Sequence, residues 1–378
     1  MAETKQVVVL GGGITGVCAA YYLRQKLQQL DSVTIVDSEG IVGACASGRA
    51  GGFLARDWDA TALGRVSFQL HAQLAHDLDG AHRWLFRHVD TFNHIGSPAD
   101  TAQVHPKLFC DALFALSDAS FVHAAVLDLV TCPMQKRVTG VRVALKSKNP
   151  KSNSGVDSNL ENIIVLPATH VVIALGPWCD PIVRLKWAIP IRPVHTQKGH
   201  SIILRPTPTN VNANASNDIN FNPVPAHCLV TRVRKMEGPE VYPRADGSIY
   251  LCGGATDNDT ILPASPSMVH TTDAVSEKLF AFAKEIIHPE LFNGKDNRQL
   301  TLETKQACFL PTSEEGPLIG RVYHESKFAY EGVFIGTANS VWGIMNGPVT
   351  GLALAELIAD GRSHTIDISD FEPMAPDS

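Results

Sequence analysis

Residues 6–37 constrain the fold of this chain more than any other stretch. They read QVVVLGGGITGVCAAYYLRQKLQQLDSVTIVD. The apolar run 7–10 predicts a short buried strand, and it leads into three glycines in G-x-G-x-x-G spacing, which are Gly11, Gly13 and Gly16. An amphipathic helical pattern follows, and a second strand at 33–36 ends on Asp37. This order of strand, glycine turn, helix, strand and acid predicts a nucleotide-binding βαβ unit.

Each part of this unit has a physical role. Gly11 permits a tight turn, Gly13 lets a pyrophosphate approach the backbone, and Gly16 lets the helix pack closely on the strand. The helix N-terminus offers unpaired N–H groups and the positive end of its dipole to phosphates. Asp37 is placed to accept hydrogen bonds from the ribose hydroxyls of an adenosine. We therefore predict a dinucleotide site here.

The composition disfavours several classes of protein. The chain has 378 residues, of which 44% are hydrophobic and 19% charged, as is typical of a globular protein. Its net charge of −6 disfavours nucleic acid as a partner, because phosphate binding needs a basic surface. No uncharged apolar run reaches the ~18 residues of a membrane helix, so we expect no integral membrane association. The start MAETKQ leaves no room for a signal peptide, which predicts a cytoplasmic protein.

The cysteines predict neither a metal site nor a disulfide framework. Eight of them are scattered along the chain without a C-x-x-C pair. In a cytosolic chain of this size we expect reduced packing residues.

Further signals extend the nucleotide fold to the end of the chain. Residues 169–180, THVVIALGPWCD, predict a buried strand that ends at Gly176. Residues 332–361 read as strand, glycine-bearing loop and helix. A strand that returns to the first sheet from so far along the chain implies an inserted domain. Within that insertion, residues 189–204 begin an antiparallel region and residues 240–254 predict a β-hairpin.

Several of these motifs together resemble a known family. GGGITG, the acid at Asp37, SGRAGG at 47–52, the strand ending ALGPW and PLIG at 317–320 are similar to the D-amino-acid oxidase superfamily of FAD-dependent oxidoreductases. That superfamily includes sarcosine and glycine oxidases, and the resemblance covers nearly the whole chain. The combination of SGRAGGFLARDW, TAQVHPKLF and NSVWGIMNGPVTG resembles most a fungal and plant branch without a settled substrate.

The resemblance implies an α/β chain with two interleaved parts. A Rossmann-like FAD-binding domain alternates with a mixed, largely antiparallel substrate-domain sheet. We assign to the FAD-binding domain residues 1–60, 104–190 and 325–378. We assign to the substrate domain residues 61–103 and 191–324. Two stretches hold too little large apolar surface to offset their ordering entropy, so we predict surface insertions at 146–162 and 206–222.

The motifs and the resemblance together predict the residues around FAD, which we expect to be bound noncovalently. They lie in the glycine turn, at the end of the second strand, in the SGRAGG loop, in the ALGPW turn and in the C-terminal loop. The predicted set is Gly11, Gly13, Ile14, Thr15, Gly16, Asp37, Ser38, Ser47, Gly48, Arg49, Ala50, Gly51, Gly52, Val126, Ala174, Gly176, Trp178, Gly336, Val341, Trp342, Gly343, Ile344 and Met345.

The substrate side departs from the family pattern. Relatives that oxidise α-amino acids often place an arginine, which pairs with the substrate carboxylate, where this chain has Phe309, Leu310 and Pro311. Sarcosine-type oxidases use a lysine where this chain has Met345. We therefore expect a small-molecule substrate that is larger than a simple amino acid or uncharged at that end. Our substrate-side candidates are Arg49, His195, Tyr242, Trp342 and Met345.

Cys308 raises the question of covalent flavin, because some relatives attach flavin through a cysteine in this region. The alternative is a buried thiol on a strand, and we favour that alternative.

Flavin carries the redox chemistry in such a protein, and the chain supplies orientation and electrostatics. Only one dinucleotide fingerprint occurs, so we expect electrons to come from an organic substrate and to leave to oxygen or another acceptor. The favoured function is oxidation of an amine or related C–N compound by hydride transfer. The alternatives are a flavin-binding sensor or trafficking-associated protein with structural FAD, and an NAD-dependent dehydrogenase.

Overall fold

The computed structural model describes residues 4–374, apart from 60, 94–99, 133, 135–136, 147–161, 209–225, 234–235, 254–260, 295–297 and 325–327. The two predicted surface insertions, 146–162 and 206–222, lie almost wholly outside the described residues.

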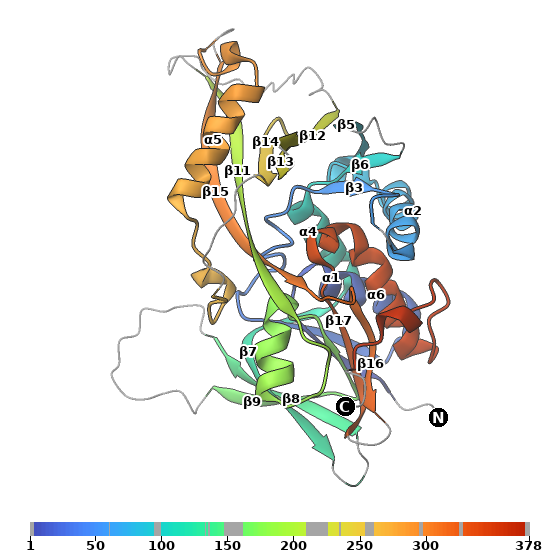
Figure 1. The fold of residues 1–378 in the computed structure, drawn as a ribbon. Coiled ribbons are helices and arrows are strands. Elements are labelled where there is room, and N and C mark those ends of the chain that lie inside the picture. Colours follow the sequence, from blue (N-terminus) through green and yellow to red (C-terminus); the bar gives the residue numbers. More distant parts are fainter. Residues whose placement is uncertain are drawn as a thin grey trace.

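A large mixed sheet forms the body of the molecule (Figure 1). Its eight strands run in the order β16-β17-β10-β1-β2-β7-β8-β9. The five strands from β17 to β7 are parallel, and antiparallel strands complete the sheet at both edges. Their bounds are β1 Gln6–Leu10, β2 Ser32–Asp37, β7 Ser120–Cys132, β8 Arg137–Leu145, β9 Ile163–Pro167, β10 His170–Ile173, β16 Leu318–His324 and β17 Phe328–Thr337.

Both faces are buried at the centre of this sheet, which explains the unbroken apolar run of β1. In β1, Val7 and Val9 pack toward the helices, and Val8 and Leu10 pack into a second core on the opposite face. The helical layer is made of α1 Ile14–Lys26, α2 Ala62–Asp77, α4 Pro106–Ser117 and α6 Gly343–Ala359. The predicted strand, helix and strand at the N-terminus are confirmed.

Helices α1 and α6 approach each other closely because glycine lines their contact. A Cβ atom at Gly351 would lie 2.5 Å from the Cβ of Cys18, and one at Gly347 would lie 2.5 Å from Ile14. By length and composition, Ser340–Ala359 would suffice to span a membrane, but 78% of its most apolar window is buried inside the structure. A core helix of a globular protein has the same properties, so this is weak evidence for a membrane span.

A second, six-stranded sheet is built from the middle of the chain. Its order is β15-β11-β14-β13-β12-β5, and its pairs are antiparallel except that of β12 with β5. Helix α5, Asp273–Ile286, packs on one face through Leu279 and Ala283. The predicted hairpin at 240–254 is confirmed as β13 and β14. The strands are β5 Asp90–Asn93, β11 His195–Pro208, β12 His227–Val233, β13 Met236–Pro243, β14 Ile249–Gly253 and β15 Arg298–Thr312.

Smaller elements connect the two large sheets. A three-stranded sheet has the order β3-β6-β4, and α3 Gly80–Arg83 precedes β4. Its strands are β3 Phe53–Ala55, β4 Arg87–His88 and β6 Thr101–Gln103. Short helical turns comprise η2 Gly176–Trp178, η3 Asp180–Lys186, η4 Pro266–Met268, η5 Pro289–Leu291, η7 Ser340–Trp342 and η8 Ser369–Phe371.

The sheets divide the chain slightly differently from the predicted domain ranges. Strand β16 falls within 191–324 but joins the eight-stranded sheet, whereas β5, from 61–103, lies in the six-stranded sheet with the other strands of the range assigned to the substrate domain. The α/β architecture itself, with a nucleotide-type sheet interleaved with an antiparallel one, is as the sequence predicts.

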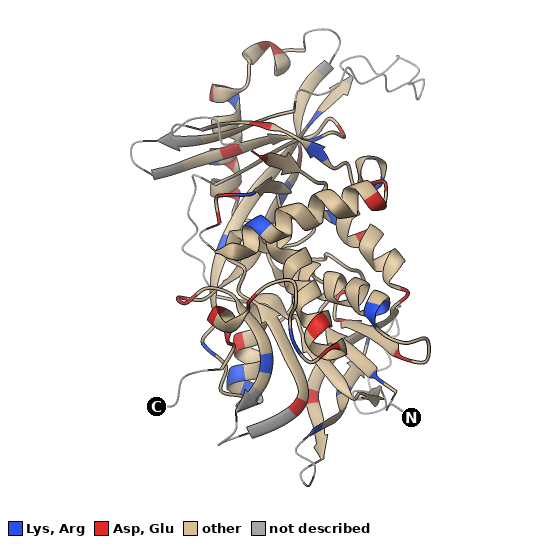
Figure 2. Cartoon of the chain, turned by 90° about the vertical axis from the view of Figure 1, so that its right-hand side faces the viewer, with Lys and Arg blue, Asp and Glu red and all other residues tan. Residues whose placement is uncertain are grey.

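The positions of Lys and Arg and those of Asp and Glu are interspersed along the chain in Figure 2. Opposite charges pair locally, as in Lys107 with Asp111 and Arg205 with Glu303.

Candidate functional site

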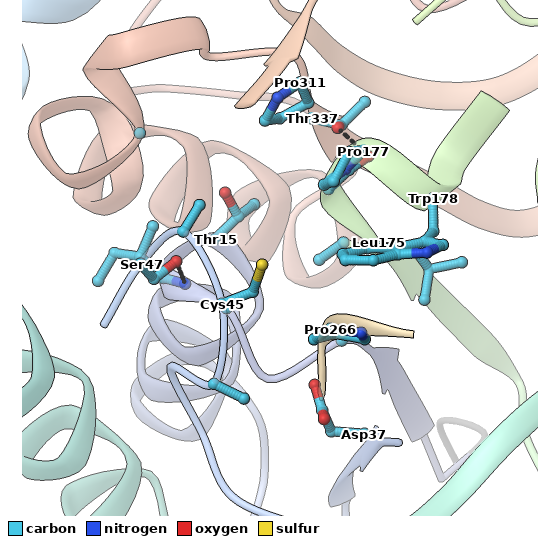
Figure 3. A pocket seen from close by; sticks show the side chains of 18 of the residues that line it. Thr15, Asp37, Cys45, Ser47, Leu175, Pro177, Trp178, Pro266, Pro311 and Thr337 are labelled. Carbon is cyan, nitrogen blue, oxygen red and sulfur yellow. Dashed lines mark hydrogen bonds between the residues drawn. The ribbon is translucent and has the colours of Figure 1, made fainter. Parts of the chain in front are cut away.

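A cavity of about 290 Å³ lies where the parallel strands of the large sheet end. Residues that follow β1, β2, β10 and β17 line it, together with Ala124–Val126 of β7. In open α/β sheets this carboxyl edge is the general place for ligands. Figure 3 shows the cavity between Asp37 at one end and Pro177, Thr337 and Pro311 at the other.

Asp37 supplies a carboxylate at one end of the cavity. Its Oδ2 accepts a hydrogen bond from the Gly12 N–H at 2.8 Å, and its Oδ1 accepts one from the Glu39 N–H at 2.8 Å. Burial raises the pKa of Asp37, and these two backbone donors act against that rise. Each oxygen retains acceptor capacity, so the group can still receive ligand hydroxyls.

The N-terminus of α1 faces the middle of the cavity. Its N-cap is Gly13, which has no side chain to cap the helix, and its first turn carries no acidic residue. The Ile14 N–H donates to Ser47 Oγ at 2.9 Å (Figure 3). A Cβ atom at Gly13 would have only that Ser47 oxygen within 4 Å, at 3.3 Å, so open space lies above the turn. The helix dipole is thus uncompensated and accessible, as suits an anionic ligand.

The other two glycines of the motif serve packing. Gly11 has a φ of +106°, and a Cβ there would lie 2.3 Å from the Ala174 carbonyl oxygen. A Cβ at Gly16 would lie 2.0 Å from the Gly11 carbonyl oxygen. Each position therefore excludes a side chain for a reason independent of the ligand.

A strained loop between β17 and α6 closes the far end. Ala338 and Ser340 both adopt left-handed backbone angles, with φ of 62° and 51°. Thr337 Oγ1 donates to the Gly176 carbonyl at 3.1 Å and ties this loop to the ALGPW turn. Asn339 Oδ1 is buried and has no hydrogen-bond partner among the described residues. Non-glycine residues in such angles cluster at functional sites.

Backbone at this end is open to a flat ligand. A Cβ at Gly176 or at Gly343 would meet nothing within 4 Å, and both glycines line the cavity. The first turn of α6, like that of α1, carries no acidic residue. The cavity therefore has two uncompensated helix N-termini along its length.

The six-stranded sheet contributes an apolar wall. Leu310 and Pro311, at the end of β15, line the cavity with Ala264 and Pro266. The Trp178 indole N–H donates to the Pro263 carbonyl at 2.8 Å, which anchors the segment that carries these last two residues.

The structure brings most of the predicted cofactor residues to the cavity. Those that line it are Gly11, Gly13, Ile14, Thr15, Asp37, Ser38, Ser47, Ala50, Val126, Ala174, Gly176, Trp178, Gly336, Val341, Gly343 and Ile344. Those that do not line it are Gly16, Gly48, Arg49, Gly51, Gly52, Trp342 and Met345. Lining the cavity is not the same as contacting FAD, so cofactor contact stays a prediction for both groups.

Glycines of the SGRAGG loop pack against protein. A Cβ at Gly48 would lie 2.1 Å from the Gly43 carbonyl oxygen, and one at Gly52 would lie 2.0 Å from that of Val104. One at Gly51 would lie 2.6 Å from the Tyr242 ring. The residues of this region that line the cavity have small side chains, and they are Ala44, Cys45, Ala46, Ser47 and Ala50.

The substrate-side candidates do not line the cavity either. The Arg49 guanidinium donates to the Ala307 carbonyl at 2.7 Å. Tyr242 stacks on Phe53 and donates to the Glu240 carboxylate, and His195 is exposed at the start of β11. Trp342 packs against the helical core, which includes the buried Met345. Their roles toward substrate stay predictions.

Several lining residues were not predicted. They include Cys45, Leu175, Pro177, Pro266, Thr337 and Asn339. Residues 44–46 directly precede the SGRAGG motif and have small side chains, and this pattern could have predicted that they line the site. Pro266 enters from another part of the chain, and no local pattern indicates that it reaches this site.

Comparisons with known proteins give a consistent result. The sequence model of the family described as FAD dependent oxidoreductase (DAO) matches residues 6–95 and 95–357. The Schizosaccharomyces pombe protein named "Putative oxidoreductase C1F5.03c" is 26% identical, over 99% of both chains. Iminodiacetate oxidase from Chelativorans sp. BNC1 has a similar structure, with a TM-score of 0.71 at 16% identity over 98% of this chain and 100% of its own. Glycine oxidase from Geobacillus kaustophilus gives 0.69 at 16% identity over 99% and 100%.

Proposed function

The chain belongs to the DAO family of FAD-dependent oxidoreductases, and from this premise we propose that it oxidises an amine that carries no carboxylate beside the reacting C–N bond. The observation that carries this proposal is the charge of the cavity. Among its described lining residues Asp37 is the one carboxylate, and none is Lys, Arg or His.

The residues present fit FAD. Asp37 would hold the adenosine ribose, and the N-terminus of α1 above Gly13 would hold the pyrophosphate. The open backbone at Gly176 and Gly343 suits the flat flavin ring. FAD bound here would supply the acceptor for a hydride from the substrate, and oxygen or another acceptor would reoxidise it. We propose noncovalent binding.

The amine assignment draws support from the structural neighbours, which are named as oxidases of iminodiacetate and glycine. Both of those named substrates carry carboxylates. In this chain the wall at Leu310 and Pro311 offers no cation to pair with one. Leaving a buried carboxylate unpaired costs several kcal/mol of binding free energy, so a substrate without that group is favoured.

The chain's own part in the reaction is orientation and electrostatics. The α6 N-terminus faces the end of the cavity where negative charge would develop, and its N–H groups favour that charge. Burial raises the pKa of Cys45, the thiol in the cavity lining, so it stays protonated at neutral pH. Hydride transfer from a neutral amine needs no general base on the protein, and we assign none.

Anaerobic reduction of the purified holoprotein tests this proposal. Amines of increasing size without a carboxylate are compared with glycine, sarcosine, D-alanine and D-proline, and bleaching of the flavin spectrum is recorded. We expect bleaching by members of the first set only. Efficient oxidation of any of the four amino acids at micromolar to low-millimolar concentration would contradict the proposal. The Arg49→Ala variant, with FAD retained, would then reveal whether Arg49 supplies the missing charge.

Reduction by dithionite serves as the control for a competent flavin. If dithionite bleaches the protein and neither set of compounds does, the proposal of amine oxidation fails and structural FAD in a sensor becomes the better interpretation.

A further inference from the structure

Helix α6 lacks one backbone hydrogen bond in the turn that follows its cavity-lining end. Pro348 lies inside the helix and has no N–H, so the carbonyl of Ile344, four residues earlier, loses its normal donor. Ile344 itself lines the cavity and is buried. An unpaired buried carbonyl is costly, so another donor is required here.

That donor is a histidine from a distant helix. His71 Nε2 lies 3.0 Å from the Ile344 carbonyl oxygen, 273 positions apart in sequence. Because a carbonyl only accepts, Nε2 must carry the proton. The side chain is fully buried, and burial lowers the pKa of His71 to about 4, so the ring is neutral at physiological pH. The ring also packs on Phe109, with centroids 5.0 Å apart.

Ser67, one turn earlier on α2, stands in for the next backbone hydrogen bond of α6, between Met345 and Val349. Its Oγ donates to the Met345 carbonyl at 2.5 Å and accepts from the Val349 N–H at 3.3 Å. The hydroxyl thus stands between the two groups that would pair directly in a regular helix. His71 and Ser67 are four residues apart and face the same strip of α6.

We propose that His71 and Ser67 are positioning residues for the flavin. They hold the carbonyls of Ile344 and Met345, and thereby fix the orientation of the α6 first turn that faces the cavity. Gly343 and Ile344 in that turn would present backbone N–H groups to the flavin, and charge stabilisation depends on how well such donors are preorganised. Neither α2 residue lines the cavity, so they act through α6.

The inference rests on the FAD site and not on the identity of the substrate. Its test therefore uses no substrate, so the result can be interpreted even if the proposal of amine oxidation fails. The matched variants are His71→Leu, which removes the donor, and His71→Gln, which keeps an N–H at similar reach. The midpoint potential and the visible spectrum of bound FAD are measured by dye-coupled reduction of the holoprotein, and the FAD Kd is measured by flavin fluorescence.

We expect His71→Leu to lower the midpoint potential, because looser N–H groups stabilise the reduced flavin less. We expect the same variant to weaken FAD binding about tenfold, the effect of losing roughly one hydrogen bond. In His71→Gln both quantities should remain close to those of the unsubstituted protein.

A purely structural role predicts something different. If His71→Leu lowers the unfolding temperature but leaves the potential, the spectrum and the Kd unchanged, the proposal is wrong. Should His71→Leu fail to fold, Ser67→Ala serves in its place. A shifted potential in Ser67→Ala supports the proposal, and an unchanged one overturns it.

Discussion

Gly13 and Gly16 stand three residues apart in one motif, and the structure gives them opposite surroundings. A side chain at Gly13 would enter the cavity, whereas one at Gly16 would collide with the Gly11 backbone at 2.0 Å. We expect Gly13→Val to fold but to lose FAD, because the new side chain occupies ligand space. We expect Gly16→Val to fail to fold. Flavin content per chain and circular dichroism separate the two, and full flavin occupancy in Gly13→Val would refute the assignment.

His71 makes a second residue-scale prediction, on stability against pH. Its pKa is about 4 in the folded chain and near 6.5 when exposed. Between these values the unfolded state binds a proton that the folded state does not, so stability present above pH 6.5 is lost as the pH falls toward 4. The loss should approach about 3 kcal/mol over this window.

The measurement is the free energy of unfolding of the apoprotein from urea titrations at several pH values. Other groups titrate in the same window, so the His71→Gln variant is the reference. The unsubstituted protein should lose more stability on acidification than this variant does. Parallel pH curves for the two proteins would count against the buried neutral ring.

At the scale of elements, the contact of α1 with α6 depends on glycine at specific positions. A Cβ at Gly351 would lie 2.6 Å from the Ala19 backbone nitrogen, and backbone does not yield easily. We expect Gly351→Val to destabilise the protein by more than about 3 kcal/mol, the range of a severe packing error.

Gly343 provides the matched control in the same helix. A Cβ there meets nothing within 4 Å, so Gly343→Ala should leave the apoprotein as stable or slightly more stable. Urea titration of the two variants compares them directly. Equal destabilisation by both substitutions would show that the close contact between α1 and α6 at Gly351 is not what makes glycine necessary there.

At the scale of the whole molecule, the way the sheets meet around the cavity bears on covalent attachment of flavin. Cys308 lies on β15 of the six-stranded sheet outside the cavity lining, and burial raises its thiol pKa to about 12. Cys45 lines the cavity, and Figure 3 shows its sulfur there, but burial raises its pKa as well. Both thiols stay protonated, and the thiolate is the nucleophile.

We therefore expect acid precipitation to release FAD into the supernatant. The measurement is the flavin absorbance of supernatant and pellet. Flavin retained in the pellet would mean covalent binding, and Cys45→Ala and Cys308→Ala would identify the attachment site.

The sequence by itself determined the local parts of this protein. The βαβ unit, the hairpin at 240–254 and the strand, loop and helix near the C-terminus follow from periodicity and glycine placement, which act over a few residues. The cavity residues of the first glycine turn and Asp37 were predictable for the same reason: motif, strand end and helix start are adjacent in the chain.

Only the tertiary structure decided which small residues line the cavity and which pack against other parts of the protein. Gly51 and Gly52 look like ligand glycines in sequence, yet their close neighbours, Tyr242 and the Val104 carbonyl, belong to other segments. His71 and Ser67 show the same limit, since they contact α6 across separations of 273 and 278 positions. Periodicity reports which face of an element is apolar, but the partner of a buried polar group is set by how distant elements pack.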